Sequence, residues 1–234
     1  MAPRIAVVIL ALSSLLAGES AADTSGSDRG QWKTGIDAEV DYGIGLRGRY
    51  VTIPRGVFEI FVDEASSGVS QLGGGLEFIR RRGGFELIVG VEYDRLGPED
   101  GLWLDRGDTP PQETPDLVEF EDFGWITLDV AAVWHEPIHD QFAVRYGAGF
   151  GLGVPTGELL RTDTQCTGSE TSTCSPIAGP DEGRYREAED LPPVVPVVNA
   201  LIGVQYRPAD WLSLNVEGGI RSVIYAGTSV SAFF

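Results

Sequence analysis

The chain has 234 residues, with 35 acidic and 17 basic side chains and a formal net charge of -18. Hydrophobic residues make up 42% of it, too many for a disordered acidic tail and enough for a sizeable core. So negative a chain repels phosphate backbones, and no basic stripe offsets the repulsion. Composition therefore excludes nucleic acid as a partner, and two cysteines are too few for a disulfide scaffold.

The first residues have the pattern of a secretory signal peptide. Arg4 gives a short basic start, an apolar run of 13 residues covers 5–17, and Ser20-Ala21-Ala22 fits a cleavage site for small residues. The run is too short to span a bilayer and has no amphipathic period that would favour the alternative, a buried N-terminal helix. We expect a signal peptide over 1–22 and a mature chain that starts at Asp23.

Alternation with a period of two dominates the chain from residue 36 onward. In 36–46 the even residues are apolar and the odd residues are acidic or glycine, which is the pattern of a strand. The same alternation is strong in 85–94 and 142–154. Weaker copies lie at 72–80, 124–134, 198–207, 212–221 and 224–234. The sequence thus predicts an all-β protein of eight strands.

The links between these segments alternate in length. Short links lie at 81–84, 136–141 and 208–210, and long polar links lie at 47–71, 95–123 and 155–196. Tight turns at one end and long loops at the other are typical of an up-and-down antiparallel barrel in an outer membrane, with turns in the periplasm and loops outside. We expect this barrel over 33–234, after a flexible periplasmic lead-in over 23–32.

A soluble barrel would have the same periodicity with its faces reversed, apolar inside and polar outside. Two features favour the membrane form. The polar sets alternate with glycines, which suits a crowded interior, and aromatic residues gather near the strand ends, as interfacial girdles require. The predicted girdles are Phe85, Trp134, Phe142, Tyr206, Trp211 and Phe234 at the turn side, and Tyr50, Tyr93, Trp103 and Tyr225 at the loop side.

The last strand ends in Phe234, with Val230 and Ala232 on the same face. Together with the signal peptide, the eight alternating segments and the three long loops, this terminal aromatic resembles the small outer-membrane β-barrel proteins of Gram-negative bacteria. The resemblance implies a location in the cell outer membrane and Phe234 as an assembly signal. It also implies contacts with the lipid bilayer, lipopolysaccharide and the barrel assembly machinery. Members of this broad group range from structural anchors to lipid-modifying enzymes.

The inward-facing charges predict an ion network in the lumen with more acids than bases. A turn centred near Ile138 would place Arg145 opposite Ala131 and diagonal to Asp129, which makes Arg145 the expected hub. The expected members of the network are Arg145, Asp129, Glu77, Glu86 and Glu39. Such a network either locks the barrel or forms a path for cations or protons.

Glycines form a second inward set, which we expect to cluster toward the loop end. They are Gly43, Gly45, Gly73, Gly75, Gly147, Gly149, Gly151 and Gly153. The space they leave is filled by aromatics such as Phe123 and Trp125, is entered by a loop, or opens as a small vestibule. The third alternative would make the protein a small porin-like channel or a ligand-binding barrel.

The long loops carry three further features. Val57, Ile60 and Phe61 recur with helical spacing after Pro54, which predicts a short amphipathic helix over 57–65. The acidic second loop has the composition to gather divalent cations but lacks the spacing of a calcium loop, so no defined metal site is predicted. Cys166 and Cys174 in the third loop predict one disulfide, because an exported chain meets an oxidising compartment.

Support for catalysis is thin: a lipid-modifying barrel with a Ser-His pair would need a histidine on the outer wall or at the mouth. Both histidines, His135 and His139, fall in an expected periplasmic turn, and the carboxylates have no defined pocket beside them. We therefore expect a protein that is not an enzyme and has no cofactor. Its expected role is structural or interactive, with the long acidic loops as the working surface.

Overall fold

The structure is a computed structural model that describes residues 38–59, 62–64, 68–105, 107, 110, 114–177, 187–188 and 191–234. The predicted signal peptide (1–22), the lead-in (23–32) and Asp37 lie outside the described residues.

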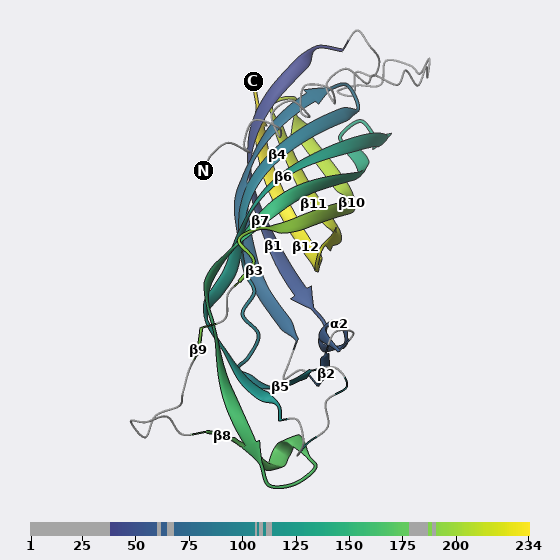
Figure 1. Cartoon of the computed structure of the whole chain (residues 1–234). Helices are drawn as coiled ribbons and strands as arrows, with labels where there is room; N and C mark the ends of the chain where they lie inside the picture. Colours follow the sequence, from purple (N-terminus) through teal and green to yellow (C-terminus); the bar gives the residue numbers. More distant parts are fainter. Residues whose placement is uncertain are drawn as a thin grey trace, which may run out of the picture.

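Eight antiparallel strands pair in a closed ring, so the wall of the barrel has no free edge (Figure 1). The ring closes where the first strand pairs with the last, from Gly43 opposite Phe233 to Thr52 opposite Ile224. In ring order the strands are β1 (Val40–Ile53), β3 (Val69–Arg82), β4 (Phe85–Arg95), β6 (Asp116–His139), β7 (Phe142–Cys166), β10 (Val195–Ala209), β11 (Leu212–Arg221) and β12 (Ile224–Phe233).

Side chains alternate between the lumen and the exterior along every wall strand. In β4, Glu86, Ile88 and Glu92 are buried, whereas Val91 and Tyr93 are exposed. The exterior is apolar, with Leu72 74% exposed and Leu46 66% exposed, and the interior holds most of the charges. This arrangement is the reverse of that in a soluble barrel and confirms the predicted faces.

Turns of two residues join the strands at one end, which we name the turn end, and the other end is the loop end. The turns are Gly83-Gly84, Asp140-Gln141 and Asp210-Trp211, and Gly83 has a φ of 58°. At the loop end β11 and β12 are joined by Ser222-Val223 alone, and Ser222 has a φ of 55°. The predicted alternation of short and long links is thus present.

The strands are longer than predicted at the loop end. β6 and β7 continue their pairing beyond the wall, up to Asp116 opposite Asp163, and form a narrow extension away from the barrel (Figure 1). Short strands complete it: β2 (Val62–Glu64), β5 (Gly101–Asp105), β8 (Cys174–Pro176) and β9 (Glu187–Ala188). The long links predicted over 95–123 and 155–196 therefore contain paired strands, because two paired strands satisfy each other's backbone groups outside the wall.

A bulge marks the point where the two strands leave the barrel. The register shifts between the pair Glu121–Glu158 and the pair Gly124–Thr156. Asp122 has a φ of 48° and Gly157 a φ of 82°, a region that favours glycine. A side chain at Gly157 would meet the carbonyl oxygens of Glu121 and Asp122. The glycine therefore permits the close approach of the two strands at this bend.

The first long link contains a single helical turn, α2 (Arg55–Phe58), followed by strand β2. The predicted amphipathic helix over 57–65 was wrong: its described part divides between the end of α2 and the strand, while residues 60, 61 and 65 lie outside the described residues. A short 3-10 helix, η1 (Thr171–Thr173), lies in the third link. Within the described residues, no helix is long and apolar enough to cross a membrane.

Aromatic rings form a belt outside the turn end. Ring centroids lie 5.5 Å apart for Phe85–Trp134 and 4.8 Å apart for Phe142–Tyr206. Trp211 and Phe234 are exposed on the same side. This matches the predicted turn-side girdle, and Phe234 has the outward position expected of it, although its role as an assembly signal stays a prediction.

The loop-side girdle was only half right. Tyr50 and Tyr93 are exposed on the outer wall, but Tyr225 is 3% exposed and faces the lumen because the odd residues of β12 point inward. Trp103 belongs to β5 in the extension, where its ring lies 6.2 Å from that of Phe120.

Candidate functional site: a balanced ion network in the lumen

The buried charges of the barrel are balanced. Six arginines and six carboxylates are less than 10% exposed within the barrel wall. They are Arg47, Arg49, Arg81, Arg145, Arg207 and Arg221, and Glu77, Glu86, Glu92, Asp94, Asp129 and Glu217. Among the described residues the predicted excess of acids is absent. Glu39 precedes β1 and is exposed, and Asp41 is only half-buried. Two arginines that were not predicted, Arg49 and Arg81, are buried in the lumen as well.

Glu92 on β4 is the centre of the network. Its carboxylate lies 2.6 Å from Nε of Arg47, 3.0 Å from Nη1 of Arg49 and 2.8 Å from Nη1 of Arg221. The two arginines of β1 and the last residue of β11 thus meet on one carboxylate from different parts of the wall. All four side chains are almost completely excluded from solvent, so each charge depends on the others for compensation.

The same arginines extend the network to further carboxylates. Asp129 Oδ1 lies 2.5 Å from Nη2 of Arg47 and 3.4 Å from Nη2 of Arg221. Glu217 lies 3.1 Å from Arg49 and 3.4 Å from Arg145. These contacts tie β1, β4, β6, β7 and β11 together across the lumen.

A second group of charges lies nearer the turn end, around Glu86. Its carboxylate lies 2.7 Å from Nη2 of Arg81, 3.5 Å from Nε2 of His135 and 4.0 Å from Nη2 of Arg145. The guanidinium of Arg81 also lies 3.4 Å from the ring centroid of Phe233, a cation–π contact.

Arg145 does not pair with Asp129, and the reason is the register of the β6–β7 hairpin. The turn falls at Asp140-Gln141, two residues later than predicted, and Arg145 therefore lies opposite His135 while Asp129 lies opposite Gly151. Arg145 instead links Glu86 and Glu217. The predicted hub is a bridge between the two groups of charges, and the centre is Glu92.

The remaining predicted members have different surroundings. Glu77 is buried and accepts a hydrogen bond of 2.8 Å from the Ser231 hydroxyl. Glu39 lies outside the buried set. On the β10–β12 side of the lumen neutral side chains accompany the charged ones, with Gln205 donating to Asn215 and Asn215 donating to Ser229, both at 2.9 Å.

Inward glycines make room for the network and do not leave the outer lumen empty. A Cβ at Gly73 would meet Oδ1 of Asp94, one at Gly90 would meet the guanidinium of Arg47, and one at Gly45 would meet Glu77. Trp125 supplies the expected aromatic filling: it lies 3.7 Å from the Cβ position of Gly153 and donates a 3.3 Å hydrogen bond to Asp94.

Sequence reasoning missed Arg49, Arg81 and His135. Arg49 has the same parity as Arg47, so continued alternation through Tyr50 would have placed it in the lumen, but the strand was expected to end at Leu46. Arg81 and His135 were assigned to turns, whereas they lie inside β3 and β6. In each case the residue lies in a part of the strand that continues beyond the segment where apolar and polar residues alternate most clearly.

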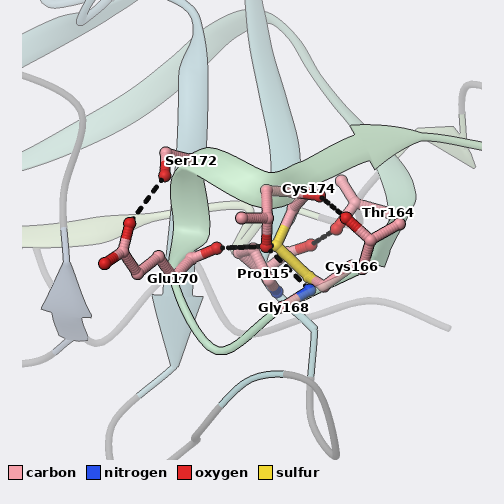
Figure 2. Close-up of a disulfide and its surroundings, with 9 residues drawn as sticks. Pro115, Thr164, Cys166, Gly168, Glu170, Ser172 and Cys174 are labelled. Carbon is pink, nitrogen blue, oxygen red and sulfur yellow. Dashed lines mark hydrogen bonds between the residues drawn. A yellow bond between two sulfur atoms is a disulfide. The ribbon is translucent and has the colours of Figure 1, made fainter.

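The disulfide joins β7 and β8 at the end of the extension away from the barrel (Figure 1), and Figure 2 shows its surroundings. Cys166 of β7 pairs directly with Cys174 of β8, and their Cα atoms are 3.9 Å apart. The enclosed turn has its own hydrogen bonds, from the Thr173 hydroxyl to the carbonyl oxygen of Glu170 at 2.6 Å and from the Gly168 amide to the Thr173 hydroxyl at 3.0 Å. The Thr164 hydroxyl also donates to the carbonyl oxygen of Pro115 (Figure 2).

We expect loss of this disulfide to affect the tip alone. The bond closes a loop with a sequence separation of eight residues, worth about 2–3 kcal/mol to the closed tip, and the barrel wall closes without it. The double variant Cys166→Ala/Cys174→Ala should retain the folded, heat-modifiable band on gels and become more sensitive to protease near Cys166. Loss of the folded band would contradict this assignment.

Among the described residues, no group of three or more histidine, cysteine or acidic side chains is placed to hold a metal ion. Binding of divalent cations by the acidic loops stays a prediction.

The architecture defines the class of this protein. An even number of antiparallel strands in a closed ring, with an apolar exterior, a charged interior and an aromatic belt, is the construction of a bilayer-spanning outer-membrane barrel. This places the chain in the outer membrane.

Comparisons with known proteins give remote similarities of fold. No protein-family model and no curated protein matches the chain. Neisserial surface protein A is 9% identical, with a TM-score of 0.46 over 84% of this chain and 99% of that one. Ail, the attachment invasion locus protein of Yersinia pestis, is 10% identical over 85% of this chain and 99% of its own. Its TM-score is 0.39, or 0.37 in complex with the heparin analogue sucrose octasulfate.

Proposed function

We propose that this protein is a sealed, non-enzymatic outer-membrane barrel that presents an acidic extension for interaction at the cell surface. The proposal rests on the different charge of the two parts of the molecule, the interior of the barrel and the segments at its loop end. Buried arginines and carboxylates balance inside the barrel, whereas the segments 54–68, 96–123 and 155–194 contain 20 acidic and five basic residues, a net charge of -15.

The extension has a defined structure that suits such a role. Paired β6 and β7 hold it away from the wall, the Trp103, Phe120 and Phe123 rings pack against one another along it, and the disulfide fixes its tip. Asp163 and Glu170 are exposed near that tip. A preorganised surface loses less entropy on binding than a free loop, and a strongly negative one steers cationic partners. We therefore infer a cationic protein or peptide as the partner, and repulsion of sulfated polyanions such as heparin.

A binding measurement on purified protein in lipid nanodiscs tests this proposal. We expect polylysine to bind and heparin not to bind, with affinity for polylysine falling as salt rises. Neutralising Glu158, Asp163 and Glu170 to Gln or Asn should weaken polylysine binding several-fold. The matched control neutralises Glu136, Asp140 and Asp210, which are exposed at the turn end, and should have little effect. Equal loss in the two triple variants, or binding of heparin, would contradict the proposed surface.

A further inference from the structure

The extension is a sheet with one buried face and one open face, and it stands away from the barrel (Figure 1). In β5, β6 and β7, which pair in this order, side chains alternate between the two faces. The buried face contains Leu104, Glu119, Leu160 and Thr162, each less than 10% exposed. The open face contains Trp103, Asp116, Val118, Phe120, Leu159 and Asp163, which are half-buried or exposed. The open face is therefore accessible to a partner.

Three residues form a row across the open face. Trp103 of β5 lies opposite Asp116 of β6, which in turn lies opposite Asp163 of β7. Neighbouring strands are about 4.8 Å apart, so an indole lies beside two carboxylates that oppose each other directly, and like charges in this position repel. The guanidinium of Arg161 lies 2.6 Å from the Asp116 carboxylate. Two acidic side chains and one basic side chain leave a net negative charge next to the indole.

Apolar side chains continue the open face from this row toward the barrel. Phe120 lies opposite Leu159, and its ring centroid is 6.2 Å from that of Trp103. Val118 separates Asp116 from Phe120 on the same face of β6. We name Val118, Phe120 and Leu159 the apolar part of the open face. Apolar patches that are rimmed by polar residues mark interaction sites on protein surfaces.

We propose that the open face binds an arginine-containing segment of a cationic protein or peptide. A guanidinium lies on the indole of Trp103 and pairs with the carboxylates of Asp116 and Asp163. A neighbouring apolar side chain of the partner packs on the apolar part of the face. The inference rests on the proposed function and deepens it, because it places the cationic partner on one face of the extension and selects arginine.

The row favours arginine over lysine, although net charge alone attracts both. A guanidinium is planar, stacks on an aromatic face and pairs with carboxylates through two hydrogen bonds. An ammonium is a compact, strongly hydrated charge and gains less from the same neighbours. A partner without cations would leave the opposed carboxylates in repulsion, and a fully polar partner would leave the apolar part uncovered.

Binding of labelled nona-arginine and nona-lysine to the protein in phosphatidylcholine nanodiscs tests the inference, because the two peptides have equal charge. We expect nona-arginine to bind about fivefold more tightly. Trp103→Leu should remove this difference, and Trp103→Phe, which keeps an aromatic ring, should retain most of it. Trp211→Leu, at the exposed turn end, is the matched control and should behave like the natural protein.

Two charge variants test the carboxylates of the row. Asp163→Asn should weaken the binding of nona-arginine about threefold to tenfold. Glu170→Gln removes an exposed charge that lies outside the row and should have a smaller effect. Heat-modifiable migration and the protease resistance of the extension are measured first on every variant, so that misfolding is recognised separately.

Three outcomes would overturn this site: equal affinity of the natural protein for the two peptides, full preference for arginine in Trp103→Leu, or equal losses in the two charge variants. The proposed function would survive these results, since both peptides would still bind. Failure of both peptides to bind would refute the proposed function together with this site.

Discussion

Replacing Glu92 with alanine should destabilise the barrel by about 3–5 kcal/mol, the cost of leaving buried charges without their partner. The carboxylate lies within 3.0 Å of three guanidiniums, those of Arg47, Arg49 and Arg221, and only the contacts with Asp94, Asp129 and Glu217 would remain to compensate them. The midpoint of urea unfolding in micelles, followed by the gel shift between folded and unfolded forms, measures the effect.

Two further variants locate the cause of this loss. Glu92→Gln keeps hydrogen-bonding oxygen at the centre and removes the charge, so its effect should be smaller than that of alanine. Glu136→Ala removes an exposed carboxylate from β6 and should leave the midpoint within about 0.5 kcal/mol of the natural protein. An unchanged midpoint for Glu92→Ala would mean that the network does not hold the wall together.

A valine in place of Gly149 should destabilise the wall by about 1–3 kcal/mol, the range for overpacking. A Cβ at this position would meet the carbonyl oxygen of Val130, and it would lie 2.8 Å from Cα of Ala131. Backbone atoms of a neighbouring strand cannot move aside as a flexible side chain can, so β6 and β7 would have to separate. The same unfolding assay measures the loss.

Gly48→Val is the matched control, because that glycine faces outward and has open space around its Cβ position. It should have little effect on the unfolding midpoint. Similar losses in the two variants would indicate a general cost of replacing glycine in strands, and not a close approach inside the wall.

The sequence allowed the wall to be predicted because alternation is a local signal. In β4, for example, Glu86 and Glu92 lie on one face and Val91 and Tyr93 on the other. The two faces can be recognised from the sequence of this strand alone, without knowledge of its neighbours. The order of the ring follows from the alternating lengths of the links. Strand ends were harder, because the acidic residues of the extension, such as Asp116 and Asp163, resemble those of a solvated loop until the two strands are paired.

The contacts within the lumen could not be predicted, because they depend on register and on the closure of the ring. A shift of two residues in the position of one turn moved Arg145 from Ala131 to His135. The meeting of Arg47, Arg49 and Arg221 at Glu92 brings together strands separated along the whole chain. The odd or even position of a residue in its strand shows whether its side chain faces the lumen. Only the three-dimensional arrangement determines which charged group it contacts there.

Ion conductance in a planar bilayer tests most directly the claim that the barrel is sealed by its own charges. The balanced arginines and carboxylates and Tyr225 are buried in the lumen, and Trp125 packs there as well, so we expect the natural protein to show no stable current after insertion. Insertion is verified independently by heat-modifiable protein recovered from the same membranes. A stable, cation-selective conductance from the natural protein would contradict the account and identify the lumen as a channel.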